Sequence, residues 1–185
     1  MRLLIMGPPG AGKGTQAAIL CDRIGIPHIS TGDLFRANLA QGTPLGQEAK
    51  KYMDAGEYVP DSVTNGMVRE RLKSQDSANG FLLDGYPRTV AQVAELDGML
   101  GGKGLDKVIE LTADTDEVVA RLINRAAEQG RADDTEEIIR HRLGVYSEQT
   151  APLTALYASR GQLIKVDGLG SVEEVTARIS DALSK

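Results

Sequence analysis

A glycine-rich loop that ends in a lysine is the first feature of the sequence that could do chemistry. Residues 7–13 read Gly-Pro-Pro-Gly-Ala-Gly-Lys and fit the spacing G-x-x-x-x-G-K. Glycines let successive backbone N–H groups turn toward phosphate oxygens, and the lysine can reach the β- and γ-phosphates of a nucleotide. The loop lies between an apolar run, Leu3–Met6, and a helical pattern from Thr15 onward. This placement predicts a phosphate-binding loop rather than a plain glycine-rich turn.

The residue after the lysine departs from the general motif. A Ser or Thr there would bind Mg²⁺, but Gly14 holds that position and Thr15 follows it. Mg²⁺ usually keeps several waters and takes one or two carboxylates together with substrate phosphates. Asp84 comes directly after the apolar run Phe81–Leu83. We therefore expect Asp84 to bind the metal, through water.

Arginine supplies most of the other candidate residues. The chain has thirteen Arg against eight Lys, and five of these arginines fall between residues 121 and 142. The planar guanidinium matches phosphate oxygens, which favours phosphate handling. The alternative is that these arginines lie on solvated helix faces beside acidic partners, and composition alone leaves both open. They are Arg121, Arg125, Arg131, Arg140 and Arg142.

Composition narrows the class of protein. The formal net charge of −5 argues against a general nucleic-acid binder. The single cysteine, Cys21, excludes an intrachain disulfide and makes a cysteine-based zinc site implausible. No apolar run approaches the ~18 residues of a membrane span, and the run at Met1–Met6 is too short for a signal peptide. We expect a cytoplasmic protein with no membrane or nucleic-acid partner.

Short apolar runs alternate with helical patterns and would position these residues. We expect buried strands at 3–6, 26–30, 81–83, 108–111 and 163–166. We expect helices at 32–41, 44–55, 61–73, 87–100 and 114–127, after Thr135 with an interruption near Pro152, and after Ser171. This order predicts an α/β fold with a parallel sheet flanked by helices. Ligands bind such folds beyond the carboxyl ends of the strands.

Four motifs in this chain resemble the signatures of the adenylate kinases, a family of nucleoside monophosphate kinases. They look like that family's phosphate loop, its monophosphate-site motif, its second signature and the end of its lid. The last shares only the Arg and the Asp pair. The likeness spans the whole chain in the right order. The motifs are Gly7–Gln16, Ser30–Arg36, Leu83–Arg88 and Arg131–Asp134.

The resemblance implies a single kinase domain over residues 1–185, with a P-loop NTPase-type parallel sheet flanked by helices. Two mobile excursions would close over the site and exclude water. One is a monophosphate-binding region, 30–59, and the other is a short lid, 126–132. The core would comprise residues 1–29, 60–125 and 133–185. Because the lid is short and no cysteine is near it, we expect no structural zinc.

The activity that the resemblance implies is reversible transfer of the terminal phosphoryl group of Mg-ATP to AMP, giving two ADP. The partners would be ATP, AMP and ADP, the cofactor Mg²⁺, and the enzyme a monomer. Phosphoryl transfer spreads charge over the equatorial oxygens, so cations and positioning supply nearly all of the catalysis. The cations that the family likeness assigns to this step are Lys13, Arg88, Arg125, Arg131 and Arg142.

The same likeness implies the residues around each nucleotide. Arg121 would stack on the ATP adenine, and Arg36 and Arg88 would grip the AMP phosphate. The ATP residues would be Gly10, Ala11, Gly12, Lys13, Gly14, Thr15, Arg121, Arg125 and Gly170. The AMP residues would be Thr31, Arg36, Glu57, Tyr58, Val59, Gly85, Tyr86, Pro87, Arg88, Gln92, Arg131 and Arg142.

Two rival functions remain open at this point. A UMP/CMP kinase shares these loops, but members of that kind usually have Ala where Thr31 stands and Asn where Gln92 stands. A nucleotide-dependent switch without catalysis is the other, although no Asn-Lys-x-Asp occurs in the sequence.

Simpler roles also exist for several single residues. Arg36 could pair with a surface acid and Arg88 could cap a turn. Asp133 and Asp134 match lid acids of the family, and they would equally suit a helix N-terminus. For His28 and His141 we expect no partner for triad or metal work, and each would be exposed or packed.

Overall fold

The chain folds around one parallel β-sheet. The structure, a computed structural model, describes residues 1–129 and 135–184. Within these residues five strands pair in the order β2-β3-β1-β4-β5, and every pairing is parallel. They are β1 (Arg2–Met6), β2 (His28–Ser30), β3 (Phe81–Asp84), β4 (Lys107–Thr112) and β5 (Leu163–Asp167). The predicted fold class, a parallel sheet flanked by helices, is confirmed.

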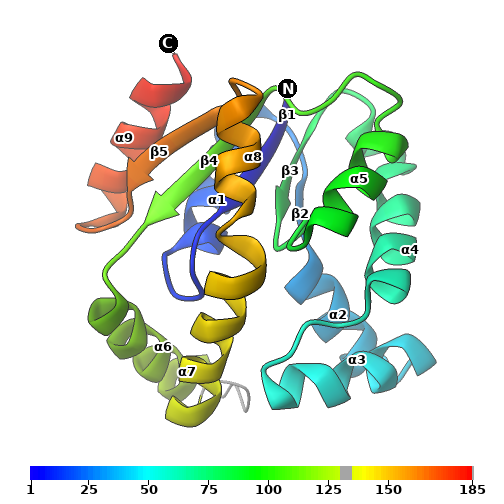
Figure 1. Cartoon of the computed structure of the whole chain (residues 1–185), viewed down its shortest axis with the longest axis vertical. Helices are drawn as coiled ribbons and strands as arrows, with labels where there is room; N and C mark the ends of the chain where they lie inside the picture. The colour runs from blue at the N-terminus through cyan, green and yellow to red at the C-terminus, as the bar shows by residue number, and fades with distance from the viewer. Residues whose placement is uncertain (130–134, 185) are drawn as a thin grey trace.

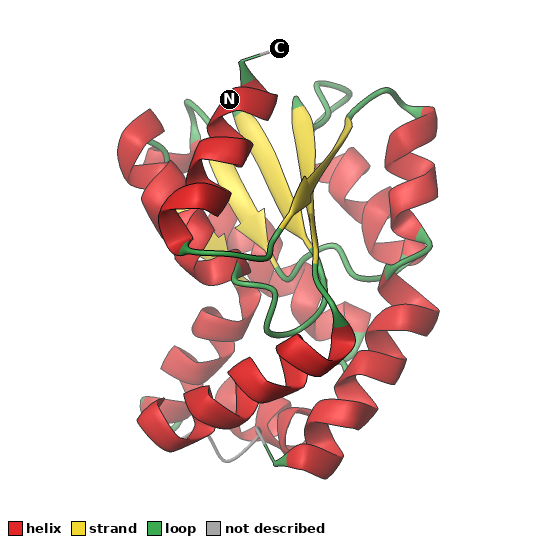
Figure 2. Ribbon diagram, turned by 90° about the vertical axis from the view of Figure 1, so that its left-hand side faces the viewer, coloured by secondary structure: helices red, strands yellow, loops and turns green. Residues whose placement is uncertain are grey.

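Helices cover both faces of the sheet (Figure 1), and the view in Figure 2 shows the strands enclosed between them. Among the described helices, none combines the length and the apolar character needed to cross a membrane. The helices are α1 (Lys13–Ile24), α2 (Thr31–Ala40), α3 (Pro44–Ala55), α4 (Asp61–Leu72), α5 (Val90–Met99), α6 (Thr115–Gln129), α7 (Glu136–Val145), α8 (Leu153–Ser159) and α9 (Val172–Leu183), with a 3₁₀ turn, η1 (Gln75–Ser77), and a π-helical turn, η2 (Tyr146–Thr150).

The alternation of side chains along β1 builds a core on each face. Leu4 and Met6 belong to the cluster that includes side chains of α4, α5 and α8. Leu3 and Ile5 point to the opposite face and belong to the cluster formed with α1 and α9. All four are almost fully buried. The sheet is therefore a fixed platform from which the loops at its carboxyl edge project.

Two smaller apolar clusters lie beyond this edge. One joins α2 and α3 through Phe35, Ala49 and Val59. The other joins α6 and α7 through buried residues that include Leu122 and Ile139. Figure 1 shows the two helix pairs on opposite sides, below the carboxyl ends of the strands. Each pair thus has a core of its own, separate from the cores that pack on the sheet.

Most of the predicted elements are present close to their predicted bounds. α2, α3 and α4 match the helices expected at 32–41, 44–55 and 61–73 to within one residue at either end. Ser171 and Glu174 form the capping box that starts α9. β2 is shorter than expected and begins only at His28. The π-helical turn η2, between α7 and α8, was not predicted.

Candidate active site

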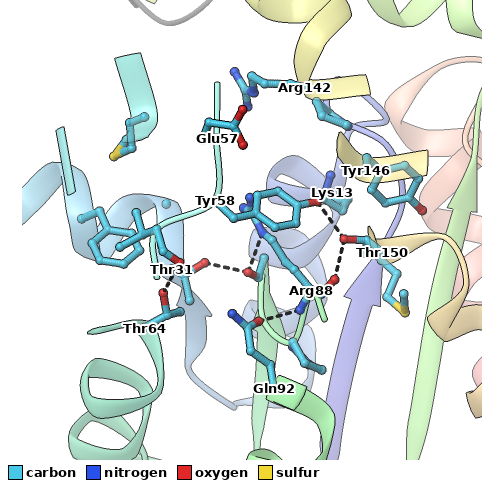
Figure 3. Close-up of a pocket in the computed structure, with 18 of the residues that line it drawn as sticks. Lys13, Thr31, Glu57, Tyr58, Thr64, Arg88, Gln92, Arg142, Tyr146 and Thr150 are labelled. Carbon is cyan, nitrogen blue, oxygen red and sulfur yellow. Dashed lines mark hydrogen bonds between the residues drawn. The ribbon is translucent and has the colours of Figure 1, made fainter. Parts of the chain in front are cut away.

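A cavity lies at the carboxyl ends of β1 and β3, between the phosphate loop and the α2–α3 region (Figure 3). The fold brings residues that are far apart in the sequence to its wall. Those that the sequence predicted are Lys13, Thr31, Arg36, Glu57, Tyr58, Val59, Gly85, Pro87, Arg88, Gln92 and Arg142. Most of the predicted AMP residues therefore share one cavity, while the predicted ATP residues other than Lys13 lie outside its wall.

The phosphate loop follows β1 so closely that two of its glycines have no room for a side chain. A Cβ on Gly7, where φ is +147°, would lie 2.5 Å from the carbonyl oxygen of Leu111. A Cβ on Gly10, where φ is +86°, would lie 2.9 Å from Cγ of Leu122. Gly12 then caps α1 in the left-handed conformation, so the loop leads directly into the N-terminus of that helix. The predicted strand–loop–helix context is confirmed.

Lys13 lies at the centre of a group of charges. Its Nζ donates to the carbonyl oxygens of Gly7 and Pro8, both at 2.9 Å. Burial lowers the pKa of Lys13 to about 8; the carboxylate of Asp84 opposes this shift, and the guanidinium groups of Arg88, Arg142 and Arg125 add to it. These electrostatic effects require proximity. The predicted cations from the loop, β3–α5, α6 and α7 therefore converge here.

Arg142 also brings α7 close to the end of α3 at the cavity wall. A Cβ on Gly56, at the end of α3, would lie 3.1 Å from Cγ of Arg142 and 3.1 Å from Cγ2 of Ile138. Arg140, two residues earlier in α7, is exposed and pairs with Glu136 at 2.9 Å. Arg140 is thus a surface residue, whereas Arg142 lines the cavity.

Asp84 provides a carboxylate beside the phosphate loop. It ends β3, is 9% exposed, and its Oδ2 would lie 3.9 Å from a Cβ on Gly14. Within the described residues no three metal-ligating side chains gather into a site. One carboxylate next to a phosphate loop is a donor set that suits Mg²⁺, which completes its shell with water and substrate oxygens. The residues present fit the predicted magnesium position.

The sequence predicts no triad or metal partner for the two histidines, and each lies beside one carboxylate in the fold. His28 Nε2 lies 3.4 Å from Oδ2 of Asp84, because β2 and β3 are neighbours in the sheet. His141 Nε2 lies 2.6 Å from Oε1 of Glu57. The second pair links α7 to the segment that follows α3, through the side chain of Glu57.

Arg121 and the segment before α9 lie together on the β5 side of the loop. Arg121 Nη1 donates to the carbonyl oxygen of Gly168 at 3.2 Å, and its Nη2 pairs with Glu117. A Cβ on Gly168 would lie 3.2 Å from the carbonyl oxygen of Ala11. Gly170 follows at φ +108°. This arrangement puts the residues predicted for the ATP base next to the phosphate loop and outside the wall of the cavity.

Thr31 and Arg88 share one acceptor. Thr31 Oγ1 donates to the carbonyl oxygen of Gly85 at 2.9 Å, and Nε of Arg88 donates to the same oxygen at 2.7 Å. The Thr31 hydroxyl can therefore only accept from a further group while this bond is present. Arg36 pairs with Asp33 on its own helix, which is the simpler pairing that the sequence left open.

Gln92 and Tyr86 are more deeply engaged in the protein than the sequence suggested. Gln92 is 2% exposed; its Oε1 accepts from the backbone N–H of Arg88 at 2.7 Å and its Nε2 donates to Asp61 at 2.6 Å. Tyr86 is fully buried in the core and donates to Asn65 Oδ1 at 2.8 Å. Its side chain is not part of the cavity wall.

Three further polar side chains line the cavity and were not predicted. They are Thr64, Tyr146 and Thr150. Thr150 has the most specific contacts, because its Oγ1 bonds both the Tyr58 hydroxyl at 2.7 Å and the carbonyl oxygen of Arg88 at 2.8 Å. No sequence signal marked it, since a lone threonine in a helical stretch has no motif.

The predicted roles of Arg131, Asp133 and Asp134 fall on residues 130–134, which lie outside the described part of the chain. The same holds for residues 130–132 of the predicted lid. α6 extends through Gln129, so residues 126–129 are helical.

Comparison with known proteins identifies the family. The sequence model of the adenylate kinases matches residues 5–162. The adenylate kinase of Kocuria rhizophila is 63% identical over 186 residues, spanning 100% of this chain and 99% of that protein. The adenylate kinase of a Nocardioides species is 64% identical over 185 residues, 99% of this chain and 97% of that protein. That of Rhodococcus erythropolis is 56% identical over the full length of both chains. The chain belongs to the adenylate kinase family.

Proposed function

We propose that this chain transfers the terminal phosphoryl group of Mg-ATP to AMP, reversibly, and produces two ADP. The observation that carries the proposal is the convergence of Lys13 with Arg88, Arg125 and Arg142 at the carboxyl edge of the sheet. Cations fixed in this way stabilise the charge that spreads over the transferring phosphoryl group. The resemblance to named adenylate kinases over the whole chain supports AMP as acceptor.

The donor would lie along the phosphate loop and the start of α1. Gly10, Ala11 and Gly12 would present backbone N–H groups to its phosphates, that of Ala11 in exchange for its bond to the carbonyl oxygen of Pro8. The exposed Gly14 and Thr15 lie in the first turn of the helix. Lys13 would exchange its bonds to the loop carbonyls for bonds to the β- and γ-phosphates. The donor base would lie between Arg121 and the backbone around Gly170, with Arg125 on the phosphates.

The acceptor would occupy the cavity, with its phosphate toward Arg88 and Arg36 and its base toward Thr31. Gly85, Pro87, Val59 and the backbone of Glu57 and Tyr58 would enclose it. Because the Thr31 proton is already donated to Gly85, its oxygen would accept from the exocyclic amino group of adenine. Gln92 would act on AMP through Arg88, whose backbone N–H it holds. Arg131 and Arg142 would complete the contacts from the lid side.

Asp84 would hold Mg²⁺, through water, beside the phosphate loop. The metal would neutralise charge on the β- and γ-phosphates during transfer. The chain's own part is to orient that carboxylate at the end of β3, next to Gly14 and His28.

Residues 30–59 and 126–132 would move against a core of residues 1–29, 60–125 and 133–185. The separate apolar clusters of α2–α3 and of α6–α7 support this division, since each pair can keep its own packing while it moves. Closure would exclude water, which otherwise would compete with AMP for the phosphoryl group. A monomeric state and a cytoplasmic location remain predictions from the sequence.

The stoichiometry of the reaction tests this proposal. Purified protein with Mg²⁺, ATP and AMP should form two ADP for each AMP consumed, and ADP alone should return ATP and AMP in equal amounts. Hydrolysis of ATP without consumption of AMP would instead indicate a nucleotide-dependent switch. The alternative function, a UMP/CMP kinase, is not favoured, because the relatives reported above are named adenylate kinases.

A further inference from the structure

The side chain of Tyr58 is linked to Arg88 in two ways, directly through its ring and indirectly through Thr150. Its ring packs against the guanidinium of Arg88, and Cζ of Arg88 lies 4.8 Å from the centroid of the Tyr58 ring. Its hydroxyl lies 2.7 Å from Oγ1 of Thr150, at the end of the π-helical turn η2 (Figure 3). Tyr58 itself belongs to the short segment between α3 and α4. One side chain therefore joins three parts of the chain around the cavity.

The hydrogen bonds in this group have a fixed direction. Thr150 has one hydroxyl proton, and it donates that proton to the carbonyl oxygen of Arg88 at 2.8 Å, because a carbonyl can only accept. The proton between Tyr58 and Thr150 must therefore come from Tyr58. The chain runs from the Tyr58 hydroxyl through Thr150 to the backbone of Arg88. Each member is satisfied, so the arrangement is rigid.

Arg88 is held at four points by this group and its neighbours. Gln92 accepts from its backbone N–H at 2.7 Å, Thr150 donates to its carbonyl oxygen, and Gly85 accepts from its Nε at 2.7 Å. The ring of Tyr58 covers one face of the guanidinium. Within the described residues, the hydrogen bonds of the guanidinium use Nε alone. The two terminal nitrogens are thus left to form the bidentate contact that a phosphate needs.

The position of Thr150 depends on the π-helical turn. The N–H of Ala151 donates to the carbonyl oxygen of Tyr146 at 2.9 Å, five residues back instead of four. Such turns insert one extra residue into a helix and are frequent at functional sites. Here the turn brings Thr150, which is 5% exposed, to the cavity wall, where it meets both Tyr58 and Arg88.

We propose that the Tyr58 side chain is a positioning residue that orients Arg88 for the acceptor phosphate. Its ring packs against the guanidinium of Arg88, and its hydroxyl holds Thr150, which bonds the backbone carbonyl oxygen of Arg88. It also links the monophosphate-binding region to the helix that carries Arg142, since η2 continues directly from α7. The proposal rests on the proposed function, in which Arg88 binds the phosphate of AMP.

Comparison of AMP with adenosine isolates this role. Adenosine lacks the phosphate, so a residue that acts through Arg88 should affect AMP affinity and leave adenosine affinity nearly unchanged. Tyr58→Leu removes the ring face and the hydroxyl and should weaken AMP about 10-fold, the scale of a partly desolvated cation–π contact. Tyr58→Phe keeps the ring and should weaken AMP about 3-fold, the scale of one hydrogen bond. The KM for ATP should change little in both variants.

Tyr52→Leu is the matched control. Tyr52 lies in the same region, packs on the α2–α3 cluster and is not part of the cavity wall. The same chemical change there should lower thermal stability without altering the ratio of AMP to adenosine affinity. If Tyr58→Leu and Tyr52→Leu both leave this ratio unchanged, the positioning role is overturned.

Two further outcomes keep the result unambiguous. If Tyr58→Leu does not fold, Tyr58→Phe and Thr150→Val test the proposal in its place. Tyr58→Phe removes one hydrogen bond of this group and Thr150→Val removes both, while the ring stays over Arg88 in each variant. An unchanged AMP-to-adenosine ratio in both would overturn the proposal. If the wild-type protein does not transfer phosphate to AMP at all, the proposed function fails first. If it does transfer and the ratio is insensitive to Tyr58, only the positioning role fails.

Discussion

Nζ of Lys13 and the carbonyl oxygen of Gly7 are 2.9 Å apart, so the lysine of the phosphate loop is bonded to the loop's own first glycine. The same ammonium lies in the field of Asp84 and of three arginines. A group held this way needs only a small movement to reach a phosphate in the loop. Burial also lowers the pKa of this ammonium, so its charge is sensitive to pH. The first prediction below removes the charge, and the second follows its protonation.

Lys13→Ala should abolish most of the turnover and leave the fold intact. The glycines of the loop and β1 are untouched by this change, while the transition state loses one cation in a dry site. We expect a decrease in kcat on the order of 10³-fold or more. Steady-state kinetics and a thermal melt of the purified variant provide the measurement. Turnover near the wild-type rate in a folded variant would rule out the phosphate-loop assignment.

Binding of ATP should take up protons above pH 8. Burial lowers the pKa of Lys13 to about 8, so at pH 8.5 more than half of this group is neutral in protein without nucleotide. The triphosphate favours the charged form and raises the pKa, and binding must then add a proton. Calorimetry in two buffers of different ionisation enthalpy measures this uptake. It should be larger at pH 8.5 than at pH 7.5, and Lys13→Met should remove it. Equal uptake in wild type and variant would contradict the lowered pKa.

Arg88→Lys should be nearly as harmful as Arg88→Ala. The guanidinium uses Nε for the carbonyl oxygen of Gly85 and retains two nitrogens for phosphate, which a single ammonium cannot reproduce. We expect kcat/KM for AMP of the two variants to agree within about tenfold. If lysine restores most of the wild-type efficiency, the bidentate role of Arg88 is wrong.

Gly46→Ala should damage the α2–α3 region specifically. A Cβ at Gly46 would overlap backbone atoms of Asn38 and Leu39 where α3 crosses the end of α2. We expect the free energy of unfolding to fall by about 1–3 kcal/mol and the KM for AMP to rise more than the KM for ATP. Gly66→Ala is the control: nothing lies within 4 Å of its Cβ in α4, so helix propensity should make it neutral or stabilising by up to about 1 kcal/mol. Similar stability of the two variants in urea would contradict the close packing.

The parts of the site that follow local rules could be predicted from the sequence. The phosphate loop needs only glycines at fixed spacing between a strand and a helix, and Gly7, Gly10 and Gly12 are all at positive φ. Asp84 could be placed because the end of a buried parallel strand always points to the ligand edge. Short apolar runs and capping residues such as Ser171 were likewise sufficient for most element boundaries.

The parts that depend on tertiary contacts could not be predicted. Thr150 meets Tyr58 across 92 residues and Arg88 across 62, and neither separation has a sequence signature. The π-helical turn that positions it is a response to this packing, because propensity does not distinguish it from an α-helix. The partners of His28 and His141 were missed for the same reason: β2 meets β3, and α7 meets the end of α3, only in the fold.

The acceptor preference tests the central claim most directly. Thr31 lines the cavity and donates its hydroxyl proton to Gly85, and in the proposed function its oxygen would accept from an adenine amino group. A site built around such a bond rejects ligands that leave its polar groups unpaired. The measurement is kcat/KM for AMP, CMP, UMP and GMP with Mg-ATP as donor, in wild type and in Thr31→Ala. We predict that the wild type strongly prefers AMP. Thr31→Ala should lose about 1–2 kcal/mol of AMP binding free energy, and its kcat/KM for AMP should exceed that for CMP and UMP by less than in the wild type. Equal wild-type efficiency with AMP and CMP would contradict the account.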